Sequence, residues 1–158
     1  MRYIIRDLKE TEYDLLNDFL YEAIFIPEGV EAPPKSIINA PELQVYVAGF
    51  GSQEHDKAMV AEVDGEIVGA AWVRIMNDYG HIDDETPSLA ISLYKEYRGQ
   101  GIGTALIKEL LAVLKNEGYK RVSLSVQKAN YAAKLYQKVG FEICGGNEEE
   151  YIMVCELQ

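Results

Sequence analysis

Hydrophobic residues recur at three- and four-residue spacing between residues 11 and 26, which predicts an amphipathic helix with Thr11 as its N-cap. The preceding segment, residues 2–6, has a β-branched centre and predicts a short strand. Four of the five prolines lie between residues 27 and 41, and the adjacent Pro33 and Pro34 exclude a regular helix there. We therefore expect residues 27–41 to be mostly loop, of a length that occurs both in binding lids and in mobile segments.

The middle of the chain has the pattern of β-strands. Residues 59–63 and 67–75 are two β-rich runs joined by Asp64 and Gly65, a dipeptide favoured in tight type I′ turns, so they predict a hairpin. Residues 77–85 are polar and turn-like. Residues 88–94 are largely apolar, as in a strand that is buried on both faces.

Strands and helices alternate in the second half of the chain. An apolar stripe through Ile102, Leu106 and Leu110 predicts a helix that stops near Gly118. The other predicted elements are a strand at 121–126, a helix at 130–138 that ends at Gly140, and strands at 141–144 and 151–157 around a turn at Gly145, Gly146 and Asn147. This order predicts one mixed α/β domain over residues 1–158.

Composition and charge limit the class of protein. A chain of 158 residues that is 48% hydrophobic fits one globular domain, at roughly 100–200 residues per domain. No apolar run approaches the roughly 18–20 residues that span a bilayer, and the first ten residues lack a signal-peptide pattern, so we expect a cytoplasmic protein with no membrane partner. The formal net charge of −11 argues against broad contact with nucleic acid. It is compatible with a cationic or amine-bearing partner, although solubility alone also accounts for it.

Cysteine and histidine give no sign of metal or thiol chemistry. Cys144 and Cys155 form neither a disulfide framework nor a four-ligand zinc site, and Cys155 has the strand spacing of a core residue. Neither His55 nor His81 has a ligand partner three or four residues away. We expect no metal and no covalent acyl-cysteine route.

The candidate chemistry is concentrated in a glycine-rich loop, residues 98–104, between a buried-type strand and an amphipathic helix. Glycine at every second position relaxes φ and leaves the backbone N–H groups accessible, and the start of the helix adds further free amides and the positive end of its dipole. Such a loop favours a diphosphate, with Arg98 and Lys95 as charged contacts. The sequence lacks both the G-x-G-x-x-G dinucleotide pattern and the Walker pattern, which disfavours a nucleotide-binding fold.

Two segments of the chain resemble the GNAT superfamily of N-acetyltransferases. Residues 98–103, RGQGIG, are similar to the family's [QR]-x-x-G-x-[GA] acyl-CoA loop. Residues 130–141, NYAAKLYQKVGF, resemble its second signature, N-x-A-x-x-LY-x-x-x-GF. The resemblance, which extends over roughly residues 62–141, implies a GNAT-like α/β fold: a mixed central sheet of about six or seven strands, a splayed strand pair and flanking helices.

The resemblance also implies how acetyl-CoA is held. The loop amides would bind the pyrophosphate of coenzyme A; in this sequence they belong to Gly99, Gln100, Gly101, Ile102, Gly103 and Thr104. The strand before the loop, at Ile91, Ser92 and Leu93, would pair through its backbone with the peptide-like pantetheine arm. Asn130 would add a side-chain hydrogen bond to the same arm, a role compatible with capping the helix that follows it.

The same resemblance assigns catalytic roles. Tyr136, the tyrosine of the LY…GF signature, would protonate or orient the departing thiol, and a backbone N–H near Leu93 would stabilise the oxyanion. Packing in the core also suits a tyrosine at position 136. Some relatives carry a glutamate early on the strand before the loop, but here Pro87 and Ser88 occupy that region. The general base is therefore left among Glu85, the nearest carboxylate, and Glu62, His81 and water.

Two functions follow from these residues. The first is an N-acetyltransferase that transfers the acetyl group from acetyl-CoA by direct attack of a primary amine, either a small molecule or a peptide. The second is a non-catalytic acyl-CoA-binding sensor, which the missing glutamate favours. The acceptor, the acyl chain and the oligomeric state, a homodimer included, are left open. Aromatic residues that line an acceptor pocket or pack in the core are Tyr21, Phe25, Tyr46, Phe50 and Tyr79.

Overall fold

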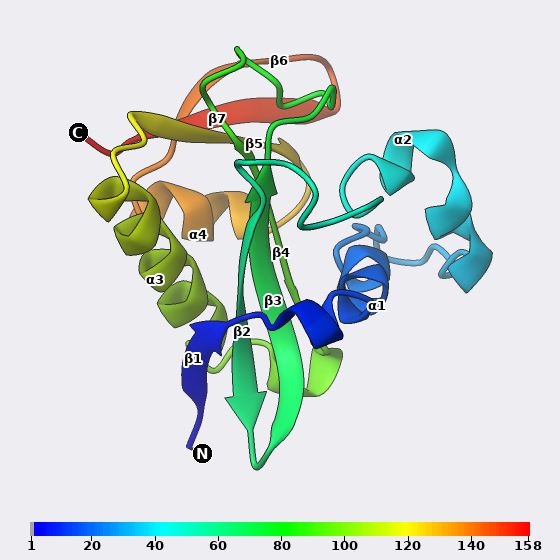
Figure 1. The fold of residues 1–158 in the computed structure, drawn as a ribbon. Coiled ribbons are helices and arrows are strands. Elements are labelled where there is room, and N and C mark those ends of the chain that lie inside the picture. The colour runs from blue at the N-terminus through cyan, green and yellow to red at the C-terminus, as the bar shows by residue number, and fades with distance from the viewer. Residues whose placement is uncertain (1) are drawn as a thin grey trace.

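The computed structural model describes residues 2–158, which contain a seven-stranded sheet in the order β1-β2-β3-β4-β5-β7-β6 (Figure 1). The strands are β1 (Ile4–Asp7), β2 (Lys57–Val63), β3 (Glu66–Arg74), β4 (Ser88–Leu93), β5 (Arg121–Gln127), β6 (Glu142–Gly146) and β7 (Glu150–Glu156). The α-helices are α1 (Leu15–Glu22), α2 (Pro41–Gln44), α3 (Ile102–Asn116) and α4 (Ala132–Lys138), and short 3-10 helices lie at Glu10–Glu12, Lys35–Asn39 and Lys95–Tyr97. The predicted mixed α/β fold is confirmed.

The sheet has two halves that meet at β4 and β5. Neighbouring strands are antiparallel except for β4 and β5, which are parallel. In Figure 1, β2, β3 and β4 run nearly vertically, whereas β5 and β7 run nearly horizontally. The two halves therefore diverge at the strand pair where the resemblance predicts a splay.

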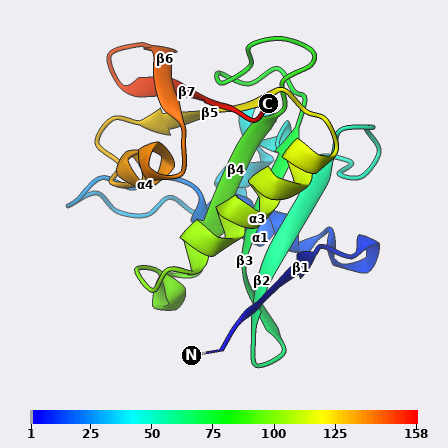
Figure 2. The same ribbon diagram turned by 90° about the vertical axis from the view of Figure 1, so that its left-hand side faces the viewer.

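Helices cover both faces of the sheet. Figure 2 shows α3 lying across β2, β3 and β4, with α4 beside it. Side chains alternate along a strand, so Trp72 and Val73 on β3 enter different cores. Trp72 packs in the cluster that includes Phe19 of α1, and Val73 packs in the cluster that includes Leu106 and Leu110 of α3.

The tight turns follow the glycine signals in the sequence. Asp64 and Gly65 have φ values of 50° and 82°, the two positive values that a type I′ turn requires, so the predicted hairpin is confirmed. The helix α3 ends at Asn116, and Gly118 follows with a φ of 92°, as a C-terminal glycine stop does.

Several predicted boundaries are wrong. Thr11 is not a helix N-cap: it lies in a 3-10 turn, and α1 begins at Leu15 after Asp14. Residues 27–41 are mostly loop, as predicted, but the segment also contains the 3-10 helix Lys35–Asn39 and its last residue begins α2. Gly145 and Gly146 belong to β6, and the turn lies at Asn147. The side-chain oxygen of Asn147 accepts hydrogen bonds from the N–H groups of Glu149 and Glu150, both at 2.8 Å. At the Asn147 turn, hydrogen bonds to a polar side chain, which hydrophobic periodicity does not reveal, set the boundary.

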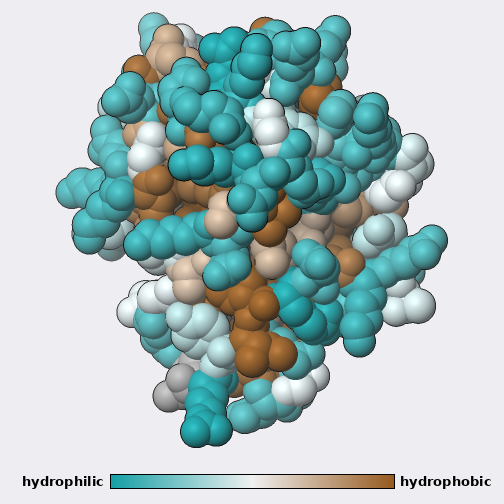
Figure 3. Space-filling model, turned by 60° about the vertical axis from the view of Figure 1, so that its left-hand side comes forward, coloured by the Kyte–Doolittle hydropathy of each residue, from teal (hydrophilic) through white to brown (hydrophobic). Residues whose placement is uncertain are grey.

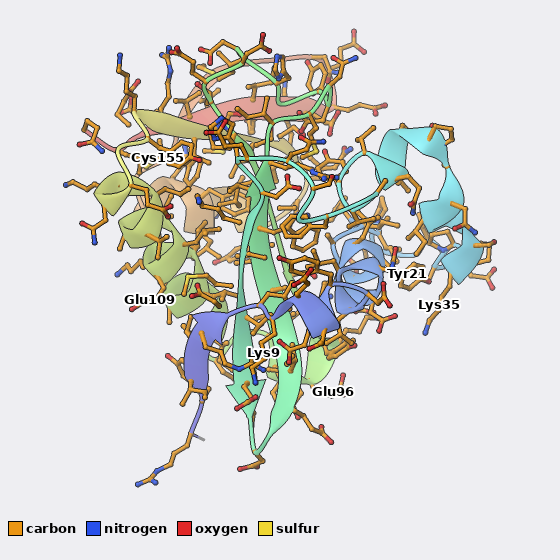
Figure 4. All side chains as sticks on the ribbon, in the orientation of Figure 1. Lys9, Tyr21, Lys35, Glu96, Glu109 and Cys155 are labelled. Atoms are coloured by element: carbon orange, nitrogen blue, oxygen red, sulfur yellow. The ribbon has the colours of Figure 1, made fainter. Side chains whose placement is uncertain are left out.

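Two contacts fasten the proline-rich segment and the loop after it. The Tyr21 hydroxyl, on α1 (labelled in Figure 4), donates a hydrogen bond to the Pro33 carbonyl at 2.5 Å. Arg74 is 1% exposed and donates to the carbonyls of Val45 and Ala48, and it forms a two-pronged ion pair with Asp56. Residues 45–56 are therefore held against the end of β3.

The face in Figure 3 is mostly hydrophilic, with apolar residues in a band between polar regions. None of the helices within residues 2–158 combines the length and the apolar character that spanning a bilayer requires. Cys155 is buried, as its spacing predicts, and Cys144 is exposed. In the same part of the chain, no group of three His, Cys, Asp or Glu side chains is arranged to hold a metal ion.

Candidate active site

The parallel strands β4 and β5 pair at one position, Ser88 with Ser123, and then separate. The Ser123 N–H donates to the Pro87 carbonyl, so odd-numbered residues of this segment direct their backbone groups toward β5. The N–H of Tyr94 donates to a β3 carbonyl, so even-numbered residues of β4 face β3. Beyond the pair, the Ile91 backbone has no strand partner on the β5 side among the described residues.

A cavity of about 290 Å³ lies in the gap between the separating strands. Its walls come from α1 and the turn after it, from β4, from β5, and from α4. The lining residues are Leu20, Ala23, Ile24, Phe25, Leu43, Tyr46, Leu89, Ala90, Ile91, Ser125, Val126, Gln127, Asn130, Tyr136 and Glu150. The cavity therefore lies along the part of β4 that leads into the glycine loop.

The glycine loop has free backbone amides. Within residues 2–158, no N–H group from Gly99 through Thr104 donates a hydrogen bond to a protein atom, and the first amide that does so is that of Ala105, which donates to the Gly101 carbonyl. Gly99 and Gly101 have φ values of 75° and 88°, and a Cβ on either would meet no atom within 4 Å. The loop thus presents a row of donors to open space at the start of the 15-residue helix α3, as an anion site requires.

The sequence model of the acetyltransferase (GNAT) family matches residues 16–141, which is most of the chain. The chain belongs to this GNAT family. The N-alpha-acetyltransferase of Sulfurisphaera tokodaii is 33% identical over 123 residues, covering 66% of this chain and 72% of that protein. The ribosomal protein bS18-alanine N-acetyltransferase of Haemophilus influenzae is 32% identical over 85 residues, which are 47% of this chain. The chain spans 58% of the length of that enzyme, little more than half.

A solved structure supports the fold. The PaiA N-acetyltransferase of Thermoplasma acidophilum, in complex with coenzyme A, superposes with a TM-score of 0.72 over 99% of each chain. The two sequences are 20% identical, so this likeness shows the GNAT fold alone.

Two residues expected at the coenzyme are engaged elsewhere in this GNAT structure. Ser92 is an even-numbered residue of β4, so its backbone bonds to β3 opposite Ala70, and its hydroxyl donates to the Phe19 carbonyl at 2.6 Å. The Ser92 backbone therefore does not face the β5 side, and the pairing of pantetheine with Ile91 and with the N–H of Leu93 stays a prediction. The guanidinium of Arg98 donates to the carbonyl of Leu93 at 2.9 Å, and it bonds to the backbone and the carboxylate of Glu22. Arg98 thus joins the end of β4 to α1, rather than extending freely from the loop.

Asn130 and Tyr136 lie together at the cavity. The side-chain oxygen of Asn130 accepts the N–H of Ala132, the first residue of α4, at 2.9 Å, and the amide NH2 group has no partner among the described residues. Tyr136 is 9% exposed and packs edge-on against Phe141, and its hydroxyl makes no hydrogen bond with the rest of residues 2–158. Burial raises the pKa of Tyr136 to about 12, so its hydroxyl stays protonated near neutrality.

The candidate bases from the sequence lie outside this cavity. Glu85 lines a separate hollow beside Arg121 and Glu117, so the structure does not bring Glu85 together with Tyr136. Glu62, on β2, is ion-paired with Arg6 at 3.0 Å. The His81 Nε2 lies 3.5 Å from an Asp84 oxygen, and its Nδ1 is buried without a partner among the described residues. The tertiary structure thus separates these groups from the predicted acid.

The structure places other ionisable groups at the cavity. Of the aromatic candidates, Phe25 and Tyr46 line it. The Tyr46 hydroxyl donates to Asp78 at 3.2 Å, and burial, with the charge of Asp78, raises the pKa of that phenol. Burial also raises the pKa of the Asp78 carboxyl. Glu150, at the start of β7, is a lining residue that the sequence pattern did not identify. Its one sequence signal is its position just after the Asn147 turn.

Proposed function

We propose that this chain is an acetyl-CoA-dependent N-acetyltransferase that acylates a primary amine. The observation that carries the proposal is the continuity of β4: its unpaired edge leads from the cavity beside Tyr136 directly into the loop of free amides. An extended ligand with an anionic end and a reactive end fits such a path. Membership of the GNAT family supports the same conclusion.

The residues present fit coenzyme A. The free amides of Gly99 through Thr104 would bind its pyrophosphate, and the open space above Gly101 is the room that the phosphates need. The backbone groups of Ile91 would pair with the amides of pantetheine, and the free NH2 group of Asn130 faces the same cavity. The bound acetyl-coenzyme would supply an activated acetyl thioester at this site.

The chain's own groups then provide acid and oxyanion assistance. The pKa of Tyr136 is about 12, so its hydroxyl is protonated and can donate to the departing thiolate. A thiolate is a stronger base in this apolar cavity than in water, because burial disfavours its charge. The N–H of Leu93 is directed toward the β5 side, where it can donate to an oxygen that gains negative charge. The apolar wall from α1 limits the access of water to the reacting groups.

The test is an assay of thiol release from acetyl-CoA with a panel of amines and amino-terminal peptides, together with calorimetric titration of coenzyme A. Binding with turnover on at least one amine is the expected result. Binding without turnover on any amine would indicate the alternative, a non-catalytic acyl-CoA sensor. Absence of binding would contradict both functions.

The acceptor is a primary amine, and both a peptide amino terminus and a small amine fit the proposal. The names of the relatives from S. tokodaii and H. influenzae, an N-alpha-acetyltransferase and a ribosomal protein alanine N-acetyltransferase, favour testing peptides. A single catalytic domain over residues 1–158, a cytoplasmic location, a cationic acceptor and a homodimer stay predictions.

A further inference from the structure

Glu150 is the one residue of the cavity lining whose side chain is charged at neutral pH. Fourteen other residues of the described chain line the cavity, and all of them are apolar or neutral polar. A carboxylate in this position dominates the local electrostatic potential, because few charges and little water surround it.

The carboxylate of Glu150 is available for a ligand. It forms no ion pair and no side-chain hydrogen bond within residues 2–158. Its backbone, in contrast, is fixed: its N–H donates to the Asn147 side chain at 2.8 Å, its carbonyl accepts the Asn147 N–H at 2.9 Å, and the residue pairs with Gln127 of β5. A rigid backbone therefore carries an uncommitted carboxylate at the cavity wall.

The surroundings of Glu150 keep its charge effective. Tyr46 and Tyr136 share the cavity with it, and both are neutral phenols with raised pKa values. Burial and the neighbouring charge of Glu149 raise the pKa of the Glu150 carboxyl. The other charged groups near it are Asp78, bonded to the Tyr46 hydroxyl, and Lys128, whose ammonium stacks on the Tyr151 ring at 5.1 Å.

We propose that Glu150 binds the ammonium group of the acceptor and takes up the first of the two protons that its nitrogen loses on acylation. Leu20, Ala23, Ile24 and Phe25 also line the cavity, so the preferred acceptor carries its amine on an apolar stem. A carboxylate next to the amine would be repelled by Glu150, which selects peptide amino termini or alkylamines over free amino acids. This inference rests on the proposed function and names the substrate class of that same site.

The proton balance is complete. The amine nitrogen forms the new bond to the acetyl carbon, and the bond between that carbon and the coenzyme sulfur breaks. The nitrogen of the bound ammonium loses two protons: the first passes to the Glu150 carboxylate, directly or through a water, and frees the lone pair for attack, and the second passes to solvent after the attack. The Tyr136 hydroxyl gives its proton to the sulfur. Exchange with solvent then restores both side chains.

The test compares Glu150→Gln with the wild-type chain on norleucine amide and on norleucine, two acceptors that share a stem and differ in the carboxylate. The wild type is expected to favour the amide by at least about tenfold in kcat/KM, because the free acid meets a like charge. Glu150→Gln should lower kcat/KM on the amide by about 10²-fold and should reduce the preference between the two acceptors. The Kd of coenzyme A should not change.

The pH profile separates a catalytic role from a structural one. Glu150 can accept a proton only when its carboxyl is ionised, and its pKa is raised. Wild-type kcat/KM should therefore fall as the pH drops through that pKa, and the profile of Glu150→Gln should lack this decline. Glu148→Gln, which removes an exposed charge from the same turn, is the control and should behave as the wild type does. Glu150→Asp keeps the charge and should retain part of the activity.

Three results would overturn the inference. Unchanged kcat/KM and an unchanged acidic limb in Glu150→Gln would exclude Glu150 while leaving the proposed function intact. A loss in Glu85→Gln, with Glu150→Gln unaffected, would move the base to the other hollow. No turnover by the wild type on any amine would remove the proposed function, and the inference with it. If Glu150→Gln fails to fold, Glu150→Asp decides: wild-type preference for the amide supports the inference, and equal rates on both acceptors contradict it.

Discussion

Ser88 of β4 and Ser123 of β5 face each other at the single point of register between the two parallel strands, and both side chains bond to the same turn. The Ser88 hydroxyl donates to Asp78 at 2.9 Å, and the Ser123 hydroxyl donates to the Gly80 carbonyl at 2.8 Å. Both serines are buried, at 1% and 0% exposure. This turn fastens the strands where they meet, and the cavity opens where they part.

Gly101→Val should abolish coenzyme binding. The φ of 88° at this position costs a β-branched residue roughly 1–3 kcal/mol, and the added side chain would project into the open space that the phosphates need. Gly103→Ala is the matched control, because Gly103 lies within α3 and a Cβ there would make an ordinary 3.6 Å contact with Leu93. Calorimetric titration with coenzyme A measures both, and normal binding by Gly101→Val would refute the loop assignment.

Tyr136→Phe should lower kcat by about 10²-fold and leave the Kd of coenzyme A unchanged, because the hydroxyl is lost and the ring is kept. Since burial raises the pKa of Tyr136 to about 12, wild-type kcat should not decline on the alkaline side through loss of this proton below about pH 11. Steady-state rates between pH 6 and about 10 check both statements. A kcat equal to the wild-type value would assign Tyr136 to packing with Phe141.

Asp56→Ala should destabilise the chain by about 3–5 kcal/mol, because it leaves the buried Arg74 guanidinium without its counter-charge. Urea unfolding followed by fluorescence of Trp72, the only tryptophan and a fully buried one, measures the change. Glu28→Ala, at an exposed position, should alter the free energy of unfolding by less than about 0.5 kcal/mol. Equal stability of the two variants would show that the Arg74 pair does not hold residues 45–56.

Acid should weaken the link between β1 and the turn after it. Hydrogen bonds from Arg6 lower the pKa of the Glu12 carboxyl to about 2, below its ordinary value of 4.5. A carboxyl whose pKa is lower in the folded chain than in the unfolded chain stabilises the fold at any pH above the unfolded-state pKa. This stabilisation is lost as the pH falls from 4.5 toward 2. The pair is partly exposed, so the loss should be less than about 1 kcal/mol.

Glu12→Gln removes the titration and should flatten this part of the curve of unfolding free energy against pH. Denaturant unfolding at several pH values between 2 and 5 gives that curve for both chains. An identical acid dependence in the two would mean that Arg6 does not hold the Glu12 carboxylate.

The loop of free amides was predictable because it is local. Glycines at positions 99 and 101 set positive φ values, and the helix that starts at Ile102 leaves its first amides free, whatever the rest of the chain does. The hairpin at Asp64 and Gly65 is equally local. The motif around Tyr136 is local as well: α4 carries Tyr136, and Asn130 and Phe141 lie just before and just after this helix.

The lining of the cavity was not predictable, because it is built from contacts between distant segments. Glu150 reaches the cavity through the pairing of β7 with β5, and Tyr46 reaches it through Arg74 and Asp56, which hold residues 45–56 in place. Glu85 is close to β4 in the sequence but lines a different hollow.

The sequence by itself determined the elements, the mixed α/β class and the anion-binding loop, since backbone conformation at glycine and the periodicity of apolar residues are short-range properties. Only the tertiary structure decided which carboxylate faces the cavity and which backbone groups of β4 are free. Both features depend on the position at which β4 and β5 separate, and strand pairing and packing between distant segments determine that position.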